Sequence, residues 1–113
     1  HLFLKQAFHI LHQNADAFCS DKVKPLVGTL DGRVYANEFR GRTHTAWTLF
    51  NADYQTFRGP VLEVLHRKRT VYTDAFSGQP IPTEIKRARA VLSVSLSPRG
   101  VGCIVAARLP KQP

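Results

Sequence analysis

The chain has 113 residues, a formal net charge of +8 and 43% hydrophobic residues. This length provides for one domain and excludes a (β/α)8 barrel, which needs roughly 250 residues. The composition is that of an ordinary globular domain, which argues against a disordered or fibrous protein. No stretch approaches the ~20 apolar residues that a membrane helix requires, so no membrane is expected as a partner.

Residues 1–20 have the periodicity of an amphipathic helix. Apolar side chains recur at spacings of three and four, which places them on one stripe of the helix: Leu4, Phe8, Leu11, Ala15 and Phe18. Such a stripe must be buried, either against the sheet that follows or against a part of a longer protein. The chain contains no methionine and starts inside this pattern, so we expect an excerpt of a longer polypeptide. Residues 1–20 are then a helix and linker from a preceding domain, and residues 21–113 form the next domain.

After residue 21 the pattern changes to short strands separated by turns. Seven runs are rich in β-branched and aromatic residues or alternate between apolar and polar residues: 23–30, 33–39, 44–51, 60–65, 70–76, 89–96 and 102–109. Glycine and proline mark the turns between them, because glycine adopts positive φ and proline fixes φ. The Asp31-Gly32 pair is a strong hairpin signal. The predicted fold is an antiparallel β-sandwich of about seven to eight strands, preceded by one N-terminal α-helix.

Metal and cofactor chemistry find little support in the sequence. His9, His12 and Asp16 share one face of the predicted helix, but the spacing is not that of a zincin helix and a further ligand is missing. A polar stripe is the better interpretation, so we predict no metal and no cofactor. Cys19 and Cys103 are far apart and lack zinc-site spacing. They can pair in an oxidising compartment, although Cys103 in its apolar run is more typical of a buried free thiol.

Three basic clusters at residues 40–42, 66–69 and 86–89 account for much of the positive charge. Basic residues that neutralise phosphates would bind nucleic acid in a salt-dependent way. The clusters also lie in predicted hairpin loops or at strand ends, where charge discourages edge pairing. No recognised nucleic-acid-binding motif accompanies them. A nucleic-acid partner is therefore the least favoured alternative.

The acidic residues do not form a pattern typical of a hydrolase. No two acids occur at a fixed spacing, and no nucleophile motif is present. Asp74 lies where a strand passes into a Ser-Gly turn, a position in which Asp commonly binds the local backbone. We therefore predict no catalytic residue in this chain.

Exposed aromatic side chains could stack on sugar rings. Trp47 is flanked by apolar residues, so we expect it to be buried. Tyr54 and Phe57 lie in a predicted loop and are the candidates for a glycan contact.

The order of these segments resembles the C-terminal β-sandwich that follows the catalytic barrel of α-amylase-like glycoside hydrolases. The matching motifs are WTLFN at residues 47–51, DAFSG at 74–78 and PRGV at 98–101, within a resemblance that spans roughly Val34 to Leu109. The resemblance implies that residues 1–20 are the last helix of the barrel and its linker. The catalytic acids of such enzymes lie on barrel strands that this chain lacks, and the resemblance does not explain the basic charge.

The sequence thus predicts a non-catalytic accessory sandwich that packs on the catalytic domain of its parent chain, stabilises it and contacts glycan. The first alternative is a carbohydrate-binding module that acts on its own. The second is a basic nucleic-acid-binding domain.

Overall fold

The computed structural model describes residues 22–109, which form eight β-strands and no helix. Their bounds are β1 Val23–Val27, β2 Val34–Arg40, β3 His44–Asn51, β4 Phe57–Leu65, β5 Thr70–Asp74, β6 Thr83–Lys86, β7 Arg89–Leu96 and β8 Val101–Arg108. The predicted fold class, a sandwich preceded by an α-helix, is wrong for this part of the chain, which is all-β. The predicted helix over residues 1–20 lies outside the described residues.

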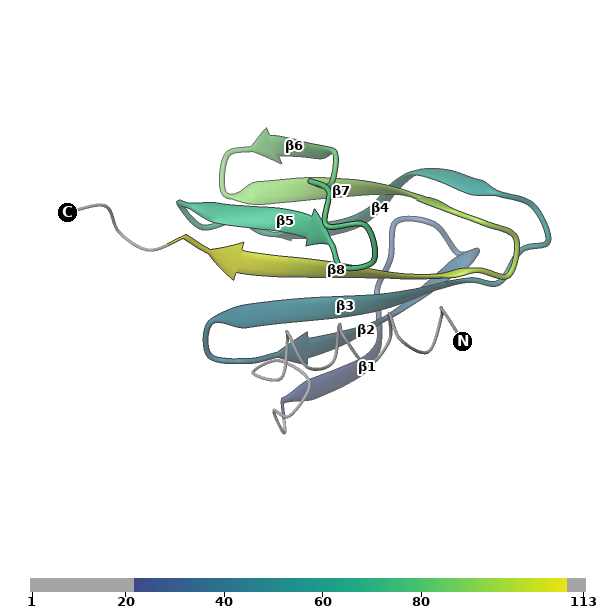
Figure 1. The fold of residues 1–113 in the computed structure, drawn as a ribbon, viewed down its shortest axis with the longest axis horizontal. Coiled ribbons are helices and arrows are strands. Elements are labelled where there is room, and N and C mark those ends of the chain that lie inside the picture. The colour runs from purple at the N-terminus through teal and green to yellow at the C-terminus, as the bar shows by residue number, and fades with distance from the viewer. Residues whose placement is uncertain (1–21, 110–113) are drawn as a thin grey trace.

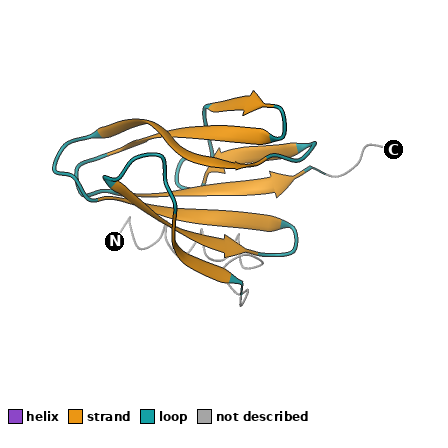
Figure 2. Cartoon of the chain, turned by 180° about the vertical axis from the view of Figure 1, so that it is seen from behind, coloured by secondary structure: helices purple, strands orange, loops and turns teal. Residues whose placement is uncertain are grey.

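The strands form two antiparallel sheets (Figure 1). One sheet has five strands in the order β1-β2-β3-β8-β5, and the other has three in the order β4-β7-β6. The chain crosses between the sheets from β3 to β4, from β4 to β5, from β5 to β6 and from β7 to β8. Viewed from behind, all described residues belong to strands or to the loops that join them (Figure 2).

Both sheets bury one face in a shared core. Trp47, Leu49 and Ile104 point inward from the five-stranded sheet, and Val61 and Leu92 come from the three-stranded sheet. All five are at most 5% exposed. Since side chains alternate across a strand, the residues between them face outward. Burial of a large aliphatic side chain contributes about 1.5–3 kcal/mol, so this layer is the main source of stability. The expected burial of Trp47 is confirmed.

A second, smaller apolar cluster lies on the outer face of the five-stranded sheet. Ala46, Cys103 and Val105 are buried there, and Phe39 and Phe76 pack against them half-buried. These residues alternate along β3 and β8 with the inward-facing Trp47 and Ile104, so both faces of the two central strands are apolar. The five-stranded sheet therefore has an apolar outer face as well as a core face.

Most of the predicted strands are present. The bounds of β3 and β7 match the prediction, and β2 and β8 are each shifted by one residue. β1 ends earlier than predicted, at Val27, after an irregularity in its pairing with β2. β4 begins earlier, at Phe57, and it accommodates Pro60 because it is an edge strand with a bulge there.

β6 has no counterpart among the predicted strands. Its four residues are all exposed, so they carry no alternating apolar pattern. It pairs with β7 through a tight hairpin in which Lys86 faces Arg89, and Arg87 adopts a positive φ of 58°. Glycine or asparagine normally marks such a turn, and neither is present. The sequence therefore lacked both signals for this strand.

Asn51, at the end of β3, is fully buried and connects three segments. Its amide nitrogen donates to the carbonyl oxygens of Gln55 (2.8 Å) and Ser97 (3.0 Å), and its Oδ1 accepts from the backbone N–H of Asp53 (3.0 Å). One side chain thus joins the β3–β4 loop to the β7–β8 loop. These loops shape one end of the sandwich.

We predict that Asn51→Ala lowers the free energy of unfolding by about 2–3 kcal/mol, because it leaves buried backbone groups unpaired. Urea denaturation measures this loss. Ser95→Ala, on an exposed position of β7, is the control and should change stability by less than about 0.5 kcal/mol. Equal effects of the two substitutions would contradict the role given to Asn51.

Candidate functional site

Asp74 closes the corner after β5. Its Oδ1 accepts hydrogen bonds from the backbone N–H groups of Phe76 (2.8 Å) and Ser77 (3.3 Å). Its own backbone N–H donates to the Gln79 carbonyl, and the N–H of Gly78 donates to the Asp74 carbonyl, both at 2.8 Å. Gly78 has a φ of +75°, which explains the glycine at that position. The prediction that Asp74 organises a turn is confirmed.

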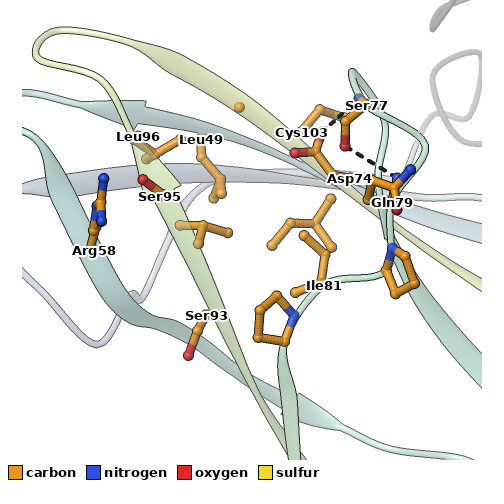
Figure 3. A pocket seen from close by; sticks show the side chains of 15 residues that line it. Leu49, Arg58, Asp74, Ser77, Gln79, Ile81, Ser93, Ser95, Leu96 and Cys103 are labelled. Carbon is orange, nitrogen blue, oxygen red and sulfur yellow. Dashed lines mark hydrogen bonds between the residues drawn. The ribbon is translucent and has the colours of Figure 1, made fainter.

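A pocket of about 350 Å³ lies beside this corner and is lined by residues of both sheets. Asp74, Ser77 and Gln79 form one side of it and Arg58 lies on the other (Figure 3). Asp74 is the one acid among the residues that line this pocket. A glycosidase uses two carboxylates on opposite sides of the scissile bond, so the lining does not provide that pair.

Cys103 lines the same pocket as a buried, free thiol. Burial, together with the nearby negative charge of Asp74, raises the pKa of Cys103 to about 12. The thiol is therefore protonated at neutral pH and lacks the thiolate that nucleophilic chemistry requires. The prediction of a buried free thiol is confirmed. Cys19 lies outside the described residues.

The two predicted glycan-contact residues have opposite environments. Tyr54 lies in the β3–β4 loop and is 79% exposed. Phe57 is the first residue of β4, is 2% exposed and is covered by Arg33, whose guanidinium lies 5.2 Å from the ring centroid. The prediction that Phe57 lies in an exposed loop is wrong, because the ring completes the core opposite Leu96.

Arg99 supports the ring of Tyr54. Its guanidinium carbon lies 5.1 Å from the centroid of Tyr54 and 5.0 Å from that of Phe50. Its Nη1 donates to the Ala52 carbonyl at 2.8 Å. These contacts hold the exposed ring against the loop, and cation–π contact of this kind contributes about 0.5–1 kcal/mol at exposed sites.

The three basic clusters meet at one end of the sandwich, which we call the basic end. The β2–β3, β4–β5 and β6–β7 turns lie side by side there, together with the last residue of β8 (Figure 1). The exposed basic residues of this end are Lys22, Lys24, Arg40, Arg42, Arg67, Lys68, Arg69, Lys86, Arg87, Arg89 and Arg108. The other basic residues in 22–109, Arg33, Arg58 and Arg99, lie toward the opposite end. The charge of the chain is therefore strongly polarised.

A pocket of about 540 Å³ opens at the basic end between the two sheets. Arginines from both sheets line it: Arg40, Arg42, Arg67, Arg89 and Arg108. Two acids, Glu38 and Glu63, also line it, and each is bound to an arginine of the wall. Arg40 contacts Glu38 at 3.4 Å and Arg89 contacts Glu63 at 3.5 Å. The Arg89–Glu63 pair is exposed on both sides, and an exposed pair contributes about 0.2–1 kcal/mol.

Glu38 has a further structural role. Its Oε1 accepts a hydrogen bond from the indole nitrogen of Trp47 at 3.1 Å. The indole N–H of a buried tryptophan requires such a partner. Glu38 therefore anchors Trp47 across the β2–β3 pair.

The remaining site predictions concern metals and membranes. Within residues 22–109, no three His, Cys, Asp or Glu side chains lie close enough to hold a metal ion. His9, His12 and Asp16 lie outside the described residues. Among the elements that the structure describes, no helix is long and apolar enough to cross a membrane.

Comparison with known proteins gives a likeness of fold. No protein-family model matches the chain, and no curated protein matches it. One similar solved structure is the crystal structure of an Anoxybacillus alpha-amylase, described as giving insights into a new glycosyl hydrolase subclass. The likeness has a TM-score of 0.58 at 10% sequence identity and covers 90% of this chain and 21% of the amylase chain. At this identity it concerns the fold alone, and the present chain spans about a fifth of the amylase's length.

We predict that Asp74→Ala lowers the free energy of unfolding by about 1–2 kcal/mol, because two backbone N–H groups lose their acceptor. Asp74→Asn keeps an oxygen at that position and is the matched control, with a smaller loss. Chemical denaturation of the three proteins checks the order. A loss from Asp74→Asn as large as that from Asp74→Ala would show that the charge, rather than the turn, matters.

Proposed function

We propose that the chain is a non-catalytic accessory β-sandwich of a larger carbohydrate-active protein of the α-amylase-like kind, and that it packs on the catalytic domain and stabilises it. One observation carries the proposal. The likeness to the alpha-amylase covers nearly all of this chain but a fifth of that enzyme. An accessory domain of a multidomain hydrolase makes up a similar fraction of the enzyme's length.

The chemistry of the acids supports a structural role. Asp74 is engaged in its turn, Glu38 binds Trp47 and Arg40, and Glu63 pairs with Arg89. Each of these carboxylates already serves the fold or a neighbouring arginine. We therefore assign the chain no hydrolytic reaction of its own.

The surface of β1 supports packing against another domain. This strand is exposed along almost its whole length, with Leu26 70% and Val23 42% exposed. β1 is also an edge strand, and exposed apolar edge strands pair with or pack against neighbours. In the sequence, β1 comes directly after the domain boundary that we predict near residue 21. We therefore place the contact with the preceding domain at β1.

Two measurements test the accessory role. The purified chain should hydrolyse neither starch nor synthetic α- and β-glycosides. In the longer polypeptide, Leu26→Asp should lower the unfolding temperature by several degrees, because a charge enters the contact. Turnover that survives purification and is lost in Glu38→Gln or Asp74→Asn would refute a non-catalytic role.

The isolated chain is the control for Leu26→Asp. Leu26 has a positive φ of 51°, which aspartate tolerates better than leucine, so the variant should leave the isolated chain as stable as before. An equal loss in both contexts would show that Leu26 serves the sandwich itself and not an interface between domains.

A second candidate is a carbohydrate-binding module, which Tyr54 favours. The ring is exposed and supported from one side by Arg99, so its other face is available for a sugar ring. Tyr54→Ala should weaken binding to soluble starch about fivefold or more, as measured by affinity electrophoresis. Tyr35→Ala, at another exposed tyrosine, is the control. Unchanged binding in Tyr54→Ala would remove this candidate.

A further inference from the structure

The basic end has arginines that the fold does not use. Arg42, Arg67 and Arg108 line the 540 Å³ pocket and form no ion pair with any other residue in the described part of the chain. They come from three different elements, namely the β2–β3 turn, the β4–β5 turn and the end of β8. All three are exposed. Like charges brought together in this way repel, and the repulsion destabilises the compact state unless an anion is bound.

Two turns of the basic end, β4–β5 and β6–β7, contain an arginine in the left-handed conformation. Arg69 and Arg87 adopt positive φ values of 64° and 58°. Arginine in this region costs about 1–2 kcal/mol relative to its ordinary conformations, and glycine would not incur that cost. No hydrogen bond or ion pair of either side chain compensates within residues 22–109.

The arrangement fits an anionic group. A guanidinium presents a planar fork of donors that matches the oxygens of a sulfate or carboxylate, and such bonds are stronger than neutral ones. The pocket is concave and is walled by the β2–β3 and β4–β5 turns, the start of β7 and the end of β8, so it admits a substituent on a slender chain. The carboxylates of Glu38 and Glu63 are each held by an arginine at the wall, so the net charge of the lining remains positive.

The surroundings distinguish among polyanions. Nucleic-acid single strands are held by aromatic side chains that stack on bases, but the exposed tyrosines, Tyr35 and Tyr54, lie toward the opposite end. Membrane-binding segments insert several large apolar side chains, whereas the described turn tips at 41–43, 67–68 and 87–88 are glycine, alanine and polar or basic residues, with Leu65 and Leu109 exposed behind them. An acidic polysaccharide requires neither feature.

We propose that the basic end binds an acidic polysaccharide, whose sulfate or carboxylate groups lie between Arg42, Arg67 and Arg108. The choice of a polysaccharide as the ligand rests on the proposed function. The presence of an anion site rests on the position of the arginines and is independent of that function. The site is distinct from the exposed ring of Tyr54, which would bind a neutral sugar.

Binding of the purified chain to dextran sulfate and to polygalacturonate tests the proposal, with uncharged dextran as the matched polymer. Isothermal titration calorimetry at about 50 and about 200 mM NaCl should show binding that weakens steeply with salt. Binding to either acidic polymer supports the proposal, and the stronger of the two identifies the anionic group. Binding no tighter than that of uncharged dextran at the lower salt concentration would overturn it.

Substitutions locate the site. Arg67→Gln should weaken binding about twofold to fivefold, and the triple variant Arg42→Gln, Arg67→Gln, Arg108→Gln about tenfold or more. Arg58→Gln is the matched control, because Arg58 is also exposed and without an ion pair among the described residues but lies away from the basic end. Unfolding temperatures are measured first. Equal effects of Arg67→Gln and Arg58→Gln would refute the location.

Arg69→Gly and Arg87→Gly separate binding from folding. Each should raise the unfolding temperature, because glycine relieves the left-handed conformation, and each should still weaken binding about twofold to fivefold. Replacement of an arginine with a purely structural role would not raise stability and weaken binding at the same time. Unchanged binding in both variants would contradict the proposal.

Competition decides the class of polyanion. A single-stranded oligonucleotide and phosphatidylserine vesicles should bind more weakly than the better acidic polysaccharide at equal salt. Equal or tighter binding of either would overturn the assignment to a polysaccharide. These binding measurements use the isolated chain, whereas the accessory role is tested by the stability of the longer polypeptide. A negative result in one test therefore does not refute the other proposal.

Discussion

The burial of two inward faces against each other holds this chain in its register. Leu49 and Ile104 from one sheet meet Leu92 and Val61 from the other, and each is almost fully buried. Because side chains alternate, a slip of one residue in any strand would expose this layer and bury its polar neighbours. The register of the strands within each sheet follows from that one requirement.

The two ends of the sandwich differ in how they use their polar groups. At one end, Asn51 and Arg99 join two loops and support Tyr54. At the other end, the β2–β3 and β4–β5 turns, the start of β7 and the end of β8 bring arginines together around a pocket. The first end uses its polar groups for its own structure. The second end keeps charges that the fold does not neutralise.

The sequence predicted the strands well where burial and turn residues mark them, and poorly where neither does. The β7 segment alternates, the β3 segment is apolar on both faces, and turn residues bound both, so their limits were correct. β6 is exposed on every residue and enters its hairpin through Arg87, so neither burial nor turn chemistry marked it. The sequence pattern predicts a loop at Phe57, because polar residues precede it and a glycine and a proline follow it. In the structure its partner across the sheet, Leu96, draws it into the core.

The sequence by itself determined an all-β architecture after residue 21, the turn at Asp74, the buried thiol of Cys103 and the excess of basic charge, because each depends on local pattern or composition. The tertiary structure alone decided where that charge gathers. In an antiparallel sandwich every second connection lies at the same end. The end at which a loop lies therefore depends on the number of strands that precede it. Omitting β6 would move the cluster at residues 86–89 to the opposite end. Only the pairing of β6 with β7, which the sequence does not signal, brings the three clusters together.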